Sequence, residues 1–433
     1  MVVTIIGAGL AGCEAALQCA RRGVRVRLYE MRPVKMTPAH QTGDVAELVC
    51  SNSLKSEEPT NAHGLLKAEL KILGSVLLEC AERARVPGGK ALVVDRKIFS
   101  REVARELQNL GVELIREEIT RIPEGVTIIA TGPLTSEGMT QSLINIFGDR
   151  RLYFYDAIAP IVAADSLDMQ KIFTASRYGK GDDYLNCPLS EEEYDRFVQE
   201  LAAAEVYPAH EFEQIQFFEG CLPVEELARR DRLALAFGPM KPVGLVDPRT
   251  GRMPFAVVQL RPENRAGTMY NLVGFQTRLR RPEQERVFRM IPGLERAEFL
   301  RYGSIHRNTF LNSPEILLPT LQTRIRRDLF IAGQLAGVEG YVESIGTGLV
   351  AGINAVRLVK EKAPLTVPEM TMLGALLKYI TTPNPHFQPM NANFGLLPVG
   401  NIRAVTARRR HLMAVRALEA LEGIRAEFAQ DKI

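Results

Sequence analysis

The first thirty residues hold the pattern that most restricts the fold of this chain: an apolar strand, a glycine-rich turn, a helix and a second strand. Residues 2–6 (VVTII) form a continuous apolar run typical of a buried parallel strand, and residues 11–21 carry apolar side chains at helical spacing. Gly23 ends that helix, and residues 24–30 alternate into a second strand that finishes at Glu30. This order predicts the first unit of a Rossmann-like parallel sheet.

The turn after the first strand reads GAGLAG and predicts a site for a dinucleotide. Its first glycine permits the tight turn, the second lets a pyrophosphate approach the backbone, and the third lets helix and strand pack closely. The phosphates then meet the positive end of the helix dipole. Glu30 is placed to accept hydrogen bonds from a ribose diol. The predicted cofactor contacts of this unit are Gly7, Ala8, Gly9, Leu10, Ala11, Gly12 and Glu30.

A second glycine-rich unit, FIAGQLAGVEGYVES, begins at Phe330 and again leads from a strand to a helix. It would direct another helix N-terminus at the same ligand, where the dipole could stabilise negative charge on a reduced flavin ring. We therefore expect FAD and not NAD as the bound nucleotide. Tyr341 could cover the ring or the substrate, although a tyrosine beside glycines is also a common packing device. The contacts expected from this unit are Gly333, Gln334, Gly340, Tyr341 and Ser344.

The residue pattern is different in the middle of the chain. Between about residues 156 and 314, runs such as ALAFGPMKPVGLV, FAVVQL and TMYNLVGFQTRL are strand-like and punctuated by Gly and Pro, without a helix between each. We expect an α/β protein in which a Rossmann-like FAD-binding domain, a parallel sheet with helices, is built from both chain ends around an inserted mixed α+β domain. The predicted boundaries are 1–160 and 315–433 for the FAD-binding domain and 161–314 for the inserted substrate and tRNA domain.

The six cysteines show no CxxC pair and no Cys/His cluster, so the sequence predicts neither a metal site nor a disulfide framework. Cys13, Cys19 and Cys80 fall on predicted helices among Ala and Leu and are expected to be packing residues. Cys187 precedes a predicted helix whose expected N-cap is Ser190. Cys50 and Cys221 lie in loop-like segments and stay open as reactive thiols.

Charge and hydropathy limit the compartments and partners that we expect for this protein. The first strand-like run begins at Val2, which leaves no room for a leader, and no run of 18 apolar residues occurs, so we expect a cytoplasmic protein without a membrane span. The net charge is +3, but residues 261–330 and 400–425 are rich in Arg, the side chain suited to gripping phosphate. An Arg-rich composition alone would give the same excess. The expected tRNA-facing residues are Arg278, Arg280, Arg281, Arg408, Arg409 and Arg410.

Five segments spread from residue 7 to residue 398 carry a resemblance to a known family: GAGLAGCEAA, LVCSNSLKS, FEGCLP, AGQLAGVEGYVES and QPMNANFGLLP. In this order they resemble the folate- and FAD-dependent tRNA uracil-5-methyltransferases, TrmFO. The GQxxGxxGY turn is shared with the related wobble-uridine-modifying flavoproteins, the MnmG or GidA family, so it is specific only to the larger group. The two cysteine motifs, VEGYVES and NANFGLLP favour TrmFO.

The resemblance implies a reductive methylation. Methylenetetrahydrofolate would give a one-carbon unit to C5 of the T-loop uridine of tRNA, reduced FAD would supply the electrons, and NADH or NADPH would reduce the flavin. The alternatives are the wobble-uridine reaction of the sister family, a tRNA-binding flavoprotein or chaperone without turnover, and a small-molecule flavin dehydrogenase. An oligomer is possible, but its state is not readable from the sequence.

Two cysteines are the predicted catalytic residues. Uracil C5 is a poor nucleophile until a group adds at C6, and a thiolate suits that step. Cys221, between Gly220 and Leu222, is the expected nucleophile. By resemblance Cys50 belongs at the flavin, where it could protect or release the reactive one-carbon group or remove the C5 proton. The alternative is that the two roles are exchanged. Further candidates for folate or base contacts are His306, Arg307, Asn308, Asn391 and Asn393.

Overall fold

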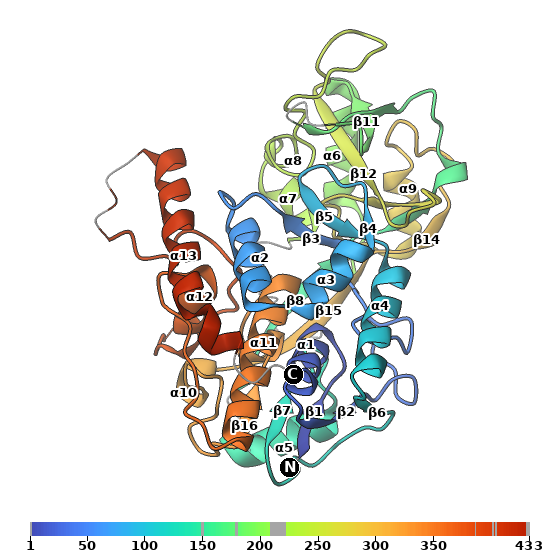
Figure 1. Cartoon of the computed structure of the whole chain (residues 1–433). Coiled ribbons are helices and arrows are strands. Elements are labelled where there is room, and N and C mark those ends of the chain that lie inside the picture. The colour runs from blue at the N-terminus through green and yellow to red at the C-terminus, as the bar shows by residue number, and fades with distance from the viewer. Residues whose placement is uncertain are drawn as a thin grey trace.

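The computed structural model describes residues 2–148, 151–177, 181–207, 222–385, 387–400, 402 and 405–429, with the backbone alone for 151–158, 305–307 and 406. Figure 1 shows a five-stranded sheet with its helices in the lower part and a six-stranded sheet with its own helices in the upper part. The α/β class with a Rossmann-like sheet is as predicted. The boundaries at residues 160 and 314 stay predictions.

The lower sheet is wholly parallel and joins strands from both ends of the chain. Its order is β16-β7-β1-β2-β6. The strands are β1 (Val2–Ile6), β2 (Arg25–Tyr29), β6 (Glu113–Ile115), β7 (Thr127–Ile129) and β16 (Leu329–Ile331). Because β16 pairs with β7 beside β1, the glycine-rich turns after β1 and β16 open at the same carboxyl edge.

Two helices lie in close contact on this sheet. α1 (Leu10–Ala20) and α11 (Tyr341–Val359) approach so closely that a Cβ added at Gly348 would lie 2.2 Å from the backbone oxygen of Ala11. The small residues of α11 therefore serve close packing. Among the described residues, α11 is the one helix long and apolar enough to cross a membrane, and 78% of that window is buried inside the protein. Its apolar composition is accounted for by its place in the core.

The upper sheet is antiparallel and has the order β10-β11-β12-β13-β9-β14. Its strands are β9 (Ile161–Ala163), β10 (Phe173–Thr174), β11 (Leu185–Leu189), β12 (Ala256–Pro262), β13 (Met269–Leu272) and β14 (Phe299–Arg301). Its helices are α6 (Glu191–Ala203), α7 (Val224–Arg230), α8 (Ala234–Phe237) and α9 (Arg281–Phe288). Ser190 caps α6 with a full capping box, as predicted. The run ALAFGPMKPVGLV begins with α8, so its reading as a strand was wrong.

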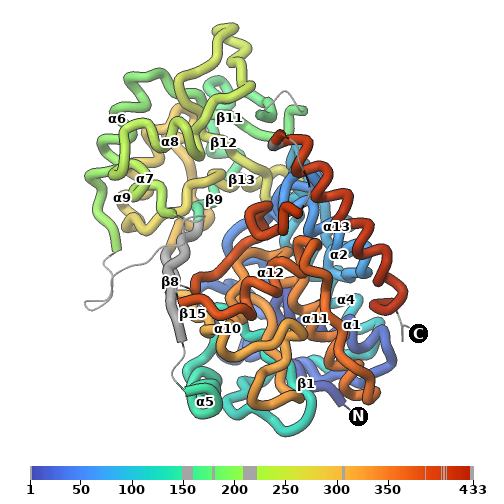
Figure 2. Tube along the Cα trace, turned by 90° about the vertical axis from the view of Figure 1, so that its left-hand side faces the viewer, coloured from blue at the N-terminus to red at the C-terminus, as the bar shows by residue number. Residues whose placement is uncertain are grey.

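The remaining elements connect and cover the two sheets. β8 (Arg151–Ile158) pairs with β15 (Ser304–Leu311) over eight residues in a ribbon between them, and β3 (Ser53–Ser56), β4 (Arg85–Val86) and β5 (Ala91–Val94) form a small sheet. The other helices are α2 (Ala62–Leu73), α3 (Val76–Arg83), α4 (Arg96–Asn109), α5 (Glu137–Phe147), α10 (Ser313–Ile316), α12 (Met372–Thr381) and α13 (Thr406–Ala429). Figure 2 shows α13 on the side of the molecule away from α9.

Candidate active site

Two neighbouring cavities lie at the carboxyl edge of the parallel sheet, and we call them together the cleft. One is lined by the first glycine turn and Glu30, and we call it the glycine-turn end. The other is lined by Cys50, the inner strands of the upper sheet and the start of α11, and we call it the Cys50 end. The two cavities share the lining residues Val49, Pro133, Leu134, Gln334, Tyr341 and Ser344. The two ends are therefore adjacent.

The glycine-turn end presents open backbone at the start of α1. The N-cap residue Gly9 makes no side-chain cap, and a Cβ added to it would meet nothing within 4 Å. A Cβ at Gly12, in contrast, would lie 1.8 Å from the Gly7 oxygen, so this glycine serves packing. The uncapped N–H groups of the first turn and the space beside Gly9 fit a pyrophosphate.

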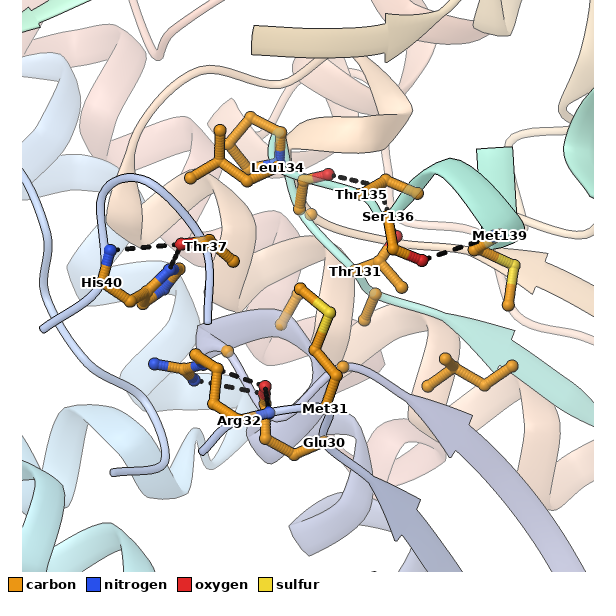
Figure 3. Close-up of a pocket in the computed structure, with 18 of the residues that line it drawn as sticks. Glu30, Met31, Arg32, Thr37, His40, Thr131, Leu134, Thr135, Ser136 and Met139 are labelled. Carbon is orange, nitrogen blue, oxygen red and sulfur yellow. Dashed lines mark hydrogen bonds and ion pairs between the residues drawn. The ribbon is translucent and has the colours of Figure 1, made fainter. Parts of the chain in front are cut away.

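Glu30 lies at this end, but Arg32 occupies its carboxylate (Figure 3). Oε2 accepts from the Ala8 backbone N–H at 3.0 Å and from Arg32, and Oε1 accepts from the Arg32 backbone and Nε. Burial alone would raise the pKa of Glu30, but the hydrogen bonds and charge of Arg32 outweigh it and lower the pKa. Glu30 is thus ionised, and a ribose diol would compete with Arg32 for its lone pairs. Arg32 was not among the predicted site residues, although it stands two residues beyond Glu30.

A second polar pair at this end is His40 and Thr37, which Figure 3 shows beside the Glu30–Arg32 pair. His40 Nδ1 and the Thr37 hydroxyl are 2.6 Å apart. Burial, helped by the charge of Arg32, lowers the pKa of His40 to about 4. The ring is therefore neutral at pH 7 and can donate or accept a hydrogen bond.

At the Cys50 end, the Cys50 loop is held from two sides. The Tyr341 hydroxyl accepts from the backbone N–H groups of Cys50 at 2.9 Å and Ser51 at 3.1 Å. Arg261, from β12, donates to the Ser51 hydroxyl at 2.8 Å and to Asn52 Oδ1 at 3.0 Å. Tyr341 thus contacts the loop through its hydroxyl. Burial, followed by the charge of Cys50, raises the pKa of Tyr341 and keeps the phenol protonated.

Cys50 lies in an electropositive environment. Arg96, Arg261 and Arg301 each interact electrostatically with its sulfur. Arg96 forms an ion pair with the buried Glu263 at 2.7 Å. These three guanidinium groups favour a thiolate, or any anion that forms beside Cys50.

The other described cysteines have the opposite character. The five described cysteines form no disulfide with one another, and only Cys50 among them is partly exposed. Cys13, Cys19, Cys80 and Cys187 are completely buried, and burial raises the pKa of each thiol, to about 12 for Cys19 and Cys80. They are packing residues, as the sequence predicts. Cys221 lies outside the described residues.

The other predicted substrate contacts divide into two groups. Asn308 and Asn391 line the Cys50 end, and Asn308 is buried. Asn393 instead holds its own loop, because its Nδ2 donates to the Asn391 carbonyl at 3.0 Å and its Oδ1 accepts from Gly395. His306 and Arg307 lie in β15, and their side chains are outside the described part of the chain.

The predicted arginine surface is not one surface. The side chain of Arg278 is 13% exposed and forms an ion pair with Glu226. Arg280 and Arg281 are exposed at the start of α9, where Arg280 pairs with Glu205. The exposed residues Arg408, Arg409 and Arg410 lie in the first turns of α13. Figures 1 and 2 place α9 and α13 far apart, so one RNA would contact both only by spanning the molecule.

Two polar residues of the upper sheet were missed at the Cys50 end: Arg261 and Asn271. Both are buried, at 7% and 3% exposure. The signal was present, because Gln259 and Arg261 alternate with apolar residues in the strand-like run FAVVQLRP, which is unusual for a buried strand. A buried polar face of this kind needs partners, and the Cys50 loop supplies them.

The chain has relatives at high identity. The family model for glucose inhibited division protein A matches residues 2–363. The chain is 60% identical over 425 residues to the methylenetetrahydrofolate–tRNA-(uracil-5-)-methyltransferase TrmFO of Geobacter sulfurreducens, covering 97% of this chain and 98% of the relative. It is 58% identical over 433 residues to the protein of the same name in Heliobacterium modesticaldum, covering 99% and 98%.

A solved structure has the same fold. GidA of Aquifex aeolicus superposes with a TM-score of 0.72 at 18% identity and covers 98% of this chain and 73% of that one. At this identity the likeness concerns the fold alone.

Proposed function

The chain belongs to the glucose inhibited division protein A family, within the group of relatives named TrmFO, and from this premise we propose that it transfers a one-carbon unit from methylenetetrahydrofolate to C5 of a uridine in tRNA. The observation that carries the proposal is Cys50: the one partly exposed cysteine of the described chain, at the edge of the cleft and beside three guanidinium groups. A reactive thiol needs access and positive charge, and this one has both.

FAD is the proposed cofactor, and the cleft suits it. The uncapped start of α1 would hold the pyrophosphate, and Glu30, Arg32 and His40 would surround the nucleoside. The N-terminus of α11, capped by Gly340 without a side chain, would face the ring system. In its reduced form the bound flavin would supply the electrons that convert the transferred carbon to a methyl group.

Residues of the chain catalyse an addition to the target uracil and then an elimination from it. A thiolate adds to C6 of uracil, the C5–C6 double bond shifts to an enolate, and C5 bonds to the one-carbon unit as the bond from that carbon to its carrier nitrogen breaks. Loss of the C5 proton to a base and cleavage of the sulfur–C6 bond restore the ring. We assign the attack to Cys221 and the work at the flavin side, including removal of the C5 proton, to Cys50.

The described residues on both sides of the segment that contains Cys221 bind to residues 276–278. The backbone N–H of Tyr207, before the segment, donates to the Arg278 carbonyl at 2.9 Å, and the backbone N–H of Val224, after it, donates to the Gln276 carbonyl at 2.7 Å. Gln276 lines the Cys50 end. Val224 is three residues from Cys221, a distance that about 10 Å of extended chain can span. These contacts support the assignment of the nucleophile.

The finer features follow from the same proposal. NADH or NADPH would reduce the flavin, the target would be the T-loop uridine, and the reaction would take place in the cytoplasm, where tRNA and folates are present. The exposed residues Arg408, Arg409 and Arg410 would make salt-sensitive contacts with tRNA phosphates.

One assay tests the function. Purified protein is incubated with unmodified tRNA, methylenetetrahydrofolate and NADH or NADPH, and the nucleosides are analysed. We expect 5-methyluridine that depends on folate. A flavin-containing protein that oxidises NAD(P)H and leaves the tRNA unchanged would contradict the proposal.

A further inference from the structure

Arg261 and Asn271 form a cross-strand pair on the wall that the upper sheet contributes to the Cys50 end. They stand opposite each other in the β12–β13 register, so their side chains project from the same face. Arg261 Nη2 donates to Asn271 Oδ1 at 3.5 Å. Because the guanidinium can only donate, this contact fixes the amide with its oxygen toward Arg261 and its nitrogen away from it.

The amide nitrogen of Asn271 has no partner in the part of the chain that the structure describes. The residue is only 3% exposed, and leaving a buried amide donor unpaired is unfavourable. The side chain lines the cleft, so a ligand bound there is the available source of an acceptor. The same sheet contains a contrasting buried residue, Asn186, whose Nδ2 donates to the carbonyls of Phe173, Ala175 and Tyr184.

The pair offers donors and positive charge, and its one acceptor, Asn271 Oδ1, is turned toward Arg261. Arg261 is buried and donates to the neutral groups of Ser51, Asn52 and Asn271, and no carboxylate among the described residues forms an ion pair with it. Such a site suits a carbonyl oxygen that becomes negatively charged during reaction. We propose that Asn271, oriented by Arg261, donates a hydrogen bond to the C4 carbonyl of the target base and so distinguishes uracil from cytosine.

The chemistry of the possible ligands favours the base. Uracil carries oxygen at C4, and this atom takes up charge when a thiolate adds at C6. Cytosine carries an amino group there, which would confront Nδ2 donor to donor. The pyrimidinone edge of a folate also presents a carbonyl oxygen, but beside it lie a ring N–H and an amino group, two donors that need acceptors and that this pair of donors does not match. The inference rests on the proposed function, since it concerns the same reaction.

Base preference is the test. Wild type and Asn271→Asp are given two transcripts that differ only in U or C at the target position, and 5-methyluridine and 5-methylcytidine are measured. The aspartate accepts where the amide donated. We expect kcat/KM on the U transcript to fall about 10- to 100-fold and the U-over-C preference to narrow by at least tenfold. An unchanged preference would overturn the inference. If wild type methylates neither transcript, it is the proposed function that fails.

Asn271→Leu and Asn186→Leu separate recognition from folding. Removing an unpaired donor should leave the Tm of Asn271→Leu unchanged or higher while activity is lost. Asn186→Leu leaves three backbone carbonyls without their donor and should lower Tm without altering the base preference of the remaining activity. A Tm loss in Asn271→Leu equal to that of Asn186→Leu would show a structural role instead. A changed flavin spectrum or folate KM with unaltered base preference would assign the pair to one of those ligands and also overturn the proposal.

Discussion

The two ends of the cleft treat charge in opposite ways. At the glycine-turn end, charged groups neutralise one another: Arg32 lies between Glu30 and Glu47, at 2.9 Å from each. At the Cys50 end, Arg261 binds only neutral partners and Asn271 keeps an unpaired donor. At the glycine-turn end, the charged groups are therefore paired before any ligand binds. At the Cys50 end, the charge of Arg261 has only neutral partners and the amide of Asn271 keeps a free donor.

This difference separates binding from chemistry. A nucleotide that stays bound gains from a preformed site whose groups are already satisfied and need little reorganisation. A reaction that develops negative charge gains from donors and cations fixed in advance and not cancelled. The comparison therefore predicts that substitutions at the glycine-turn end reduce cofactor affinity and stability, whereas substitutions at the Cys50 end reduce turnover.

The largest effect is expected for Cys50→Ala. Without the thiol, kcat should fall about 10³-fold, because the group that acts on the one-carbon unit or the C5 proton is gone. Tm and flavin content should stay near wild type, since the side chain is partly exposed. Turnover is measured by nucleoside analysis and flavin by absorbance. The matched control is Cys187→Ala, which changes a buried cysteine in β11 and should keep kcat within about twofold. Equal losses of kcat in both variants would show that Cys50 is no more important for turnover than a buried packing cysteine.

Glu30→Gln should have the next largest effect, on stability and affinity. It leaves the Arg32 charge without one of its two carboxylates inside the protein, which costs about 3 kcal/mol of unfolding free energy. The Kd for FAD should rise, while kcat at saturating FAD should change less than about threefold. Urea unfolding and flavin titration give the two numbers. A large fall in kcat at saturating FAD, with stability intact, would mean that this end takes part in the chemistry.

Much of the fold and of the glycine-turn end could be predicted because local sequence determines them. Apolar runs, glycine spacing and helical periodicity act over short distances, so β1, α1, β2 and the closely packed glycines of α11 follow from the sequence. The strand predicted in ALAFGPMKPVGLV was wrong at α8, since four apolar residues fit a helical turn as well as a strand.

The Cys50 end was only half predictable. Its cysteine and Tyr341 were identified from motifs, but the hydrogen bond that joins them connects residues 291 positions apart. Arg261 meets Ser51 across 210 positions, and only the folding of the upper sheet against the lower domain brings the two together. No spacing rule extends over such distances. Local patterns also could not show that Arg278 is largely buried against Glu226, because that pairing depends on how α7 is placed.

The third prediction uses pH at the glycine-turn end. The pKa of His40 is about 4 in the folded protein against an ordinary value near 6.5, so the unfolded chain takes up a proton first as pH falls. The stability that this residue contributes is fully present above about pH 6.5 and is lost as pH falls toward 4, on the order of 2 kcal/mol. In His40→Gln, this pH-dependent loss of unfolding free energy should disappear. Urea unfolding at pH 7, 5.5 and 4.5 measures the free energy of unfolding of both proteins. The same pH dependence in both proteins would show that the His40 ring titrates normally.

The smallest effect is expected for Tyr341→Phe, which links the two ends. The substitution keeps the aromatic ring, so any stacking on the cofactor persists, and removes the acceptor of the Cys50 and Ser51 N–H groups. The loop should loosen at a cost of about 1 kcal/mol, with kcat about tenfold lower and the FAD Kd unchanged. The control is Tyr184→Phe, which loses a single hydrogen bond to the Gly88 carbonyl and should leave kcat unchanged. A weaker FAD Kd with normal kcat in Tyr341→Phe would instead place the hydroxyl in cofactor binding, and the boundary between the two ends would move past Tyr341.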